Sequence, residues 1–118
     1  HRFEGAANPL AYELPNHTAV VVFGGGLPTG AFDGARVFTA STGMLGLGHG
    51  ALGDSASLIC NDVVISTMSY GTEGGANQSL NLATDGDGAS AWVGHLTLET
   101  APYSPGTCAD GVPFPACL

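Results

Sequence analysis

The chain has 118 residues, contains no lysine and carries a formal net charge of −8, with 10% of its residues charged. Nucleic acids and anionic membrane surfaces are bound through clustered lysine and arginine, so the two arginines, Arg2 and Arg36, exclude both kinds of partner. No run of about 20 apolar residues is present, and we expect no membrane insertion. The length predicts one domain, and the 19 glycines argue against a helical bundle.

Short apolar segments follow one another along the chain, and no segment of useful length has the 3.6-residue period of a helix. Alternating patterns and β-branched runs predict strands at residues 18–23, 35–41, 57–60, 63–70, 79–84 and 90–100. Asn61 and Asp62 fall between two of these strands as a turn or bulge. In the last strand, His95, Thr97 and Glu99 are expected on one face, where they could bind a polar ligand.

Proline and glycine mark the segments outside the strands. Residues 1–15 are expected to form an extended N-terminal arm, because prolines follow Asn8 and Leu14. Residues 101–118 hold four prolines and are expected to form an irregular, Pro-rich C-terminal tail. The whole pattern predicts an all-β fold, with residues 1–118 as a single antiparallel β-sandwich or barrel.

A glycine-rich segment lies between the second and third predicted strands. Its sequence GHGALG, at residues 48–53, matches the glycine pattern of dinucleotide-binding loops. Such a site needs a helix after the loop, but the residues that follow are strand-like. We therefore expect a surface loop, or a place where glycine lets another part of the backbone approach closely.

The three cysteines are unevenly placed along the chain. Cys108 and Cys117 enclose a short segment of the Pro-rich tail, and a disulfide between them is expected to contribute about 2–3 kcal/mol. Cys60 lies in an apolar strand and would then be a buried free thiol. Two alternatives stay open, a bridge from Cys60 to either tail cysteine and a bridge to another molecule.

Several features together predict a secreted protein. The sequence begins at His1 without a methionine, as a processed chain would. Asn16 and Asn77 each begin an Asn-x-Ser/Thr sequon and are candidate glycosylation sites. Disulfide formation in the tail also favours an oxidising, extracellular compartment.

Two patterns could hold a metal ion, and no other cofactor is expected. Asp85 and Asp87, in Asp-Gly-Asp-Gly, match the opening of a calcium loop, although the later acidic ligands are missing and a simple hairpin turn explains the motif better. At a mature N-terminus, the α-amine and imidazole of His1 could bind copper together with a second histidine. The candidates for that second histidine are His17, His49 and His95.

The sequence contains no recognisable catalytic constellation, because its glutamates are too scattered for a glycosidase pair and no Cys-x-x-Cys occurs. We expect a secreted, non-enzymatic protein, namely a self-assembling extracellular subunit of a filament, sheath or shell, and therefore a homo-oligomer. One alternative is a module that binds a glycan or another surface ligand through exposed aromatic residues. The aromatic candidates are Phe32, Tyr70, Trp92, Tyr103 and Phe114. Another alternative is a copper-binding protein built on His1.

Overall fold

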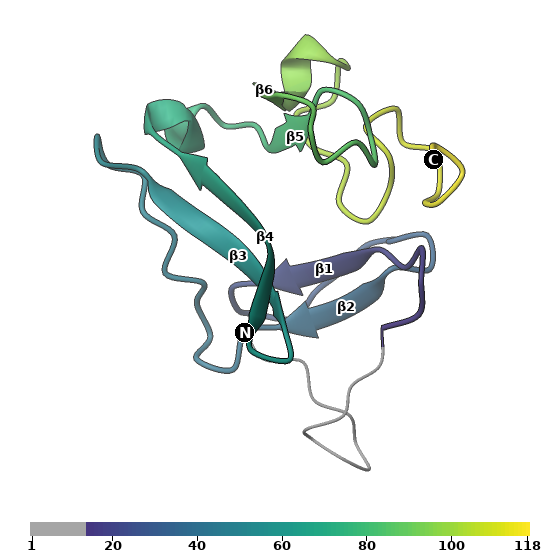
Figure 1. Cartoon of the computed structure of the whole chain (residues 1–118), viewed down its shortest axis with the longest axis horizontal. Coiled ribbons are helices and arrows are strands. Elements are labelled where there is room, and N and C mark those ends of the chain that lie inside the picture. Colours follow the sequence, from purple (N-terminus) through teal and green to yellow (C-terminus); the bar gives the residue numbers. More distant parts are fainter. Residues whose placement is uncertain (1–13) are drawn as a thin grey trace. The chain divides into compact units, whose positions relative to one another are not determined.

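The structure is a computed structural model that describes residues 14–118. The expected arm at residues 1–15, and the copper ligand His1 with it, lies almost entirely outside the described residues. Strands and two short 3-10 helices make up the regular structure, and no helix of seven or more residues occurs among residues 14–118. The all-β prediction is therefore confirmed (Figure 1).

The elements follow the predicted order along the chain. The strands are β1 (Val20–Phe23), β2 (Arg36–Thr39), β3 (Asp54–Cys60), β4 (Val63–Tyr70), β5 (Leu80–Leu82) and β6 (Trp92–Gly94). The 3-10 helices are η1 (Thr72–Gly75) and η2 (His95–Thr97). None of the helices in the described range has the length and hydropathy to cross a lipid bilayer.

Within residues 14–118 the strands form three small two-stranded sheets, which are not closed. β3 pairs with β4 and β5 pairs with β6 in the expected antiparallel sense. β1 pairs with β2 in parallel, so the antiparallel prediction is wrong for this pair. The connection at residues 24–35 is long enough for the chain to cross over, which a parallel pair requires. These sheets do not show the predicted sandwich or barrel.

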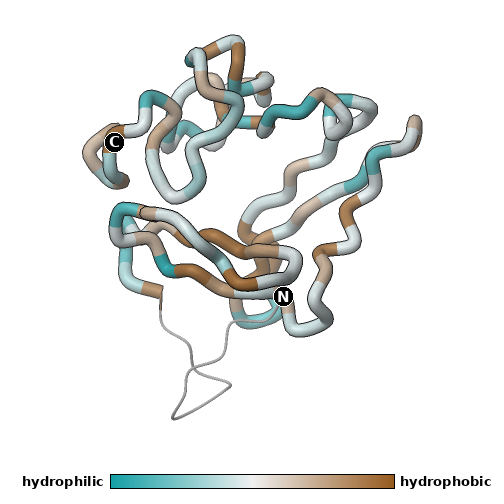
Figure 2. The backbone as a smooth tube through the Cα atoms, turned by 180° about the vertical axis from the view of Figure 1, so that it is seen from behind, coloured by the Kyte–Doolittle hydropathy of each residue, from teal (hydrophilic) through white to brown (hydrophobic). Residues whose placement is uncertain are grey.

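The described chain divides into two compact units, one made of residues 14–45 and 104–118 and the other of residues 46–103. In the first unit the ring of Phe23 meets that of Phe32 edge-on, with ring centroids 5.5 Å apart. Gly106 of the tail packs against the same sheet, since a Cβ atom there would lie 2.9 Å from the Cβ of Ala35. In Figure 2, strongly hydrophobic stretches include β1 and β2. The prediction of one domain over residues 1–118 stays a prediction.

In the second unit, the strand expected at residues 90–100 ends early. β6 covers only Trp92–Gly94, and the backbone then turns into η2, where the carbonyl of His95 accepts from the N–H groups of Leu98 and Glu99. The His95 side chain is buried, with Nδ1 2.7 Å from the carbonyl oxygen of Ala101. The prediction that His95, Thr97 and Glu99 share an exposed strand face is therefore wrong.

Few side chains are fully buried in this fold. Among residues 14–118 the buried set consists of Ala40, Cys108 and His95. Many large apolar side chains are exposed instead, which is unusual for a protein that works as an isolated monomer.

Candidate functional site

The longest regular feature is the β3–β4 hairpin, which lies wholly within the second unit (Figure 1). Its turn consists of Asn61 and Asp62, with φ angles of 49° and 61°. Two consecutive residues with positive φ are typical of the type I′ turn, whose twist matches that of the flanking strands. Asparagine and aspartate tolerate this backbone region better than most other residues, so the sequence accounts for the position of the turn.

The pairing of the two strands contains one irregularity. Leu58 pairs with Ser66, but the next residue, Ile59, pairs with Val64. Ile65 is therefore an extra residue without a partner in the ladder, which is the arrangement of a β-bulge.

Hydroxyl groups line one face of the regular part of the hairpin. Ser55 pairs with Ser69 and Ser57 pairs with Thr67, and paired residues in an antiparallel ladder lie on the same face. The Oγ of Ser57 lies 2.9 Å from the Oγ1 of Thr67, at hydrogen-bond distance. This face is polar without being charged.

The end of the hairpin next to the turn is apolar and exposed. We call this group the hairpin tip; its members are Leu58, Ile59, Val63, Val64 and Ile65. Their side chains are 49–60% exposed. From residue 55 to residue 70 the single charged residue is Asp62, in the turn. An exposed, contiguous apolar group of this kind marks an interaction surface.

The opposite end of the hairpin, its base, is fixed by hydrogen bonds to the glycine-rich loop. The Asp54 carboxylate accepts the N–H of Gly48 at 2.9 Å and that of Ser55 at 2.7 Å. The Tyr70 hydroxyl donates to the carbonyl of Gly48 at 2.8 Å. The residues 48–53, which match a dinucleotide-binding pattern, thus form a loop tied to two strands.

These contacts change the acidity of both side chains. The N–H of Gly48, and then that of Ser55, hold the pKa of the Asp54 carboxyl below its ordinary value. Burial raises the pKa of the Tyr70 hydroxyl, and the nearby carboxylate of Asp54 adds to this effect. The hydrogen bonds at this end of the folded hairpin therefore stabilise the ionised form of Asp54.

We expect Asp54→Asn to destabilise the hairpin at neutral pH, because a carboxamide has one acceptor oxygen and cannot accept both N–H groups as the carboxylate does. The folded pKa is lowered, so the carboxylate stabilises the protein above its ordinary pKa, and this contribution is lost as the pH falls through the lowered value. The difference between the two proteins in urea midpoint should therefore shrink in acid. Asp62→Asn, in the turn, is the control, and a constant difference for Asp54→Asn at all pH values would contradict the assignment.

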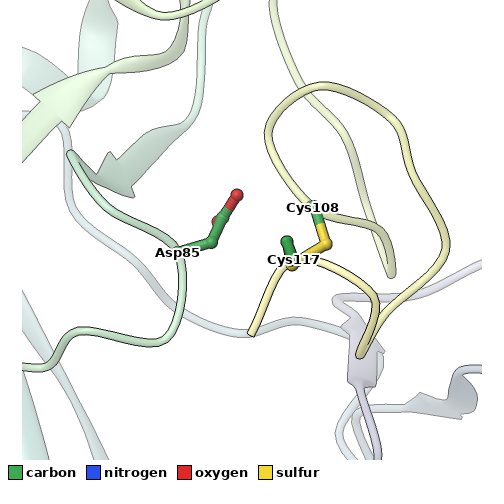
Figure 3. A group of neighbouring side chains, drawn as sticks. All are labelled: Asp85, Cys108 and Cys117. Atoms are coloured by element: carbon green, nitrogen blue, oxygen red, sulfur yellow. A yellow bond between two sulfur atoms is a disulfide. The ribbon is translucent and has the colours of Figure 1, made fainter.

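The predicted disulfide between Cys108 and Cys117 is present (Figure 3). Such a bond is consistent with an oxidising, extracellular environment. The third residue labelled in Figure 3, Asp85, belongs to the other unit. Cys60 is free, as expected, but it is exposed where a buried thiol was predicted, because β3 has no covering layer among the described residues.

Both candidate glycosylation sites lie on the surface. Asn16 is exposed in a turn that precedes β1, and Asn77 is exposed in a bend between η1 and β5, with a φ of 53°. Their accessibility is what glycosylation requires, and their modification stays a prediction.

Within the described residues, the candidate metal ligands are not seen to form a metal centre. Asp87 accepts the N–H of Ala89 through its side chain at 2.9 Å, which is the bonding of an ordinary turn. Asp85 lies in the same turn and is half-buried. His17 and His49 are exposed, whereas His95 is buried. Calcium binding by Asp85 and Asp87 and copper binding by His1 both stay predictions.

The aromatic candidates differ in exposure. Trp92 is 44% and Tyr103 is 63% exposed, whereas Phe32, Tyr70 and Phe114 are half-buried. Two of the five aromatic candidates are therefore accessible to a glycan, and glycan binding stays a prediction.

Reasoning from the sequence predicted strands at the hairpin tip but did not identify the tip as a site. The available signal was the near-absence of charge in residues 55–70. Comparison of the chain with protein-family models, with curated proteins and with solved structures found no match.

Proposed function

We propose that the chain is a structural subunit that self-assembles outside the cell, and that the β3–β4 hairpin makes the contact between copies. The observation that supports this proposal is the exposure of the hairpin tip, at 49–60% for five aliphatic side chains. Burial of apolar surface is the main favourable term in protein association.

The hairpin also has a structural need for a partner. An isolated two-stranded hairpin is at best marginally stable in water, and three or more strands or a packed face are needed for stability. Contact with a second hairpin would supply these strands. Association and folding of this part of the chain would then support each other.

Two features support a location outside the cell. The Cys108–Cys117 disulfide needs an oxidising compartment to persist. The two sequons are exposed, as substrates of glycosylation must be. The low content of charged residues, 10% of the chain, fits a structural role, and we propose a non-enzymatic one.

The proposal predicts that the purified, disulfide-intact chain forms dimers or larger species in sedimentation experiments as its concentration rises. Val63→Thr combined with Val64→Thr replaces two exposed tip valines of β4 by residues that keep β-branching. Because the apolar contact is lost, the concentration needed for assembly should rise by about tenfold or more.

Val37→Thr is the matched control, since Val37 is an exposed strand valine of the other unit. It should leave assembly unchanged. A wild-type chain that stays monomeric up to millimolar concentration would refute the proposed function.

A further inference from the structure

We infer that two copies of this chain pair through the outer edge of β4, antiparallel and about a two-fold axis, into one four-stranded sheet. This inference rests on the proposed function and specifies how the copies meet. The order of strands across the dimer would be β3, β4, β4 of the second copy and β3 of the second copy.

The two edges of the hairpin are not equivalent. The loop at residues 46–53 lies beside the start of β3, where the N–H of Gly48 bonds to the Asp54 side chain, and both views trace it on the β3 side of the ribbon (Figures 1 and 2). No other strand within residues 14–118 pairs with either β3 or β4, so the loop is the feature that distinguishes the two edges. The edge of β4 is therefore the one more open to a new strand.

The composition of β4 also suits an edge that pairs with another strand. Natural sheets protect unused edges with lysine, proline, inward charges or bulges. β4, with the sequence VVISTMSY, has no charged residue and no proline. Its single protective feature is the bulge at Ile65, and the five residues from Ser66 to Tyr70 continue in regular register with β3.

The distribution of charge selects a second copy as the partner. Each chain carries a net charge of −8, so two copies repel each other wherever their carboxylates meet. Antiparallel pairing of β4 with itself places only uncharged side chains opposite one another, and the same surface serves both copies. A basic partner would find no carboxylate along β4. Four strands also exceed the number that a stable sheet needs.

This geometry predicts how far apart the two Cys60 residues lie in the dimer. β3 is the outer strand in each half of the dimer, so the two Cys60 residues are separated by at least three strand spacings, at least about 14 Å. Cysteine Cα atoms more than about 7 Å apart cannot form a disulfide without backbone movement. Cys60 should therefore remain a free thiol in the assembled protein, whereas pairing through β3 could bring the two thiols together.

The test compares Thr67→Lys, on β4, with Ser57→Lys, its cross-strand partner on β3. Both variants lose the same hydrogen bond between the two hydroxyl groups and gain the same charge. Lysines of two copies would be brought together across the β4 edge but not across β3, which lies outside the contact. In sedimentation equilibrium, Thr67→Lys should raise the dissociation constant about tenfold or more. Ser57→Lys should change it less than about threefold.

A measurement on the wild-type chain keeps the test independent of how the variants fold. Amide exchange of β4 should slow when the concentration rises through the dissociation constant, while exchange of the residues in β3 whose N–H groups point away from β4 should not. Non-reducing electrophoresis should show no dimer linked through Cys60.

The outcomes separate the two proposals. A wild-type chain that does not associate refutes the proposed function and this inference together. Association that the two lysine variants weaken equally, or a dominant Cys60-linked dimer, refutes pairing through β4 and leaves the proposed function standing.

Discussion

Gly53→Ala is expected to destabilise the second unit by at least about 2 kcal/mol. Gly53 has a φ of 64°, in the left-handed region that side chains with a Cβ atom rarely adopt. A Cβ atom at this position would also overlap the carbonyl oxygen of Tyr70 and lie 2.7 Å from the Cα of Gly71. These obstacles are backbone atoms that cannot rotate away, so the base of the hairpin would have to open.

Gly50→Ala is the matched control in the same loop, because a Cβ atom at Gly50 would meet nothing within 4 Å. The measurement is urea unfolding followed by the fluorescence of Trp92, the one tryptophan of the chain, which lies in the same unit. Equal unfolding midpoints for the two variants would show that the close contact between Gly53 and Tyr70 does not stabilise the hairpin.

Loss of the Cys108–Cys117 disulfide is expected to destabilise the first unit by about 2–3 kcal/mol. The disulfide closes a loop of the tail, with Cys108 almost completely buried and its N–H bonded to the carbonyl of Val112 at 2.9 Å. Without the bridge the unfolded tail gains conformational freedom, which favours the unfolded state. Cys117→Ser tests the effect by amide exchange in β1, β2 and the tail.

Cys60→Ser is the control for that experiment, since Cys60 is exposed and forms no bridge in the chain. It should leave amide exchange in the first unit unchanged. Protection of β1 and β2 that persists in Cys117→Ser would mean that contacts such as that of Gly106 with Ala35, rather than the disulfide, hold the tail.

Local sequence patterns were sufficient where local chemistry decides the structure. The strand predicted at residues 63–70 coincides with β4, because a β-branched run followed by alternation has few other ways to pair. The turn at Asn61 and Asp62 and the disulfide in the tail were likewise found from residue type and spacing. These features need no knowledge of distant contacts.

Other features depend on contacts that hydropathy does not describe. Alternation predicted a strand through residue 100, but a Cβ atom at Gly94 would lie 2.5 Å from Oε1 of Gln78, and the same oxygen accepts the N–H of Leu96. This contact at the start of η2 is made by a residue far away in the sequence. Hydropathy also does not predict that β1 and β2 pair in parallel, because the alternation along a strand is the same in both directions.

The candidate site shows the same limit more sharply. Hydropathy identifies the residues of the hairpin tip as apolar, but it does not say whether they are covered. The structure leaves them 49–60% exposed, because the hairpin has no strand beyond β3 and β4 among the described residues. A single sequence reports how apolar a segment is, but not whether the surface that covers it belongs to the same molecule.

The contrast between the parallel β1–β2 pair and the β3–β4 hairpin bears on which insertions and deletions the chain can accept. A parallel pair needs a crossover of about a dozen residues, so the connection at residues 24–35 is close to the minimum and should tolerate lengthening but not shortening. The Asn61–Asp62 turn sets the register of its hairpin by having two residues, so a single added residue there would shift the pairing of the strands. Epitope tags or fluorescent labels therefore belong in the crossover and not in the turn.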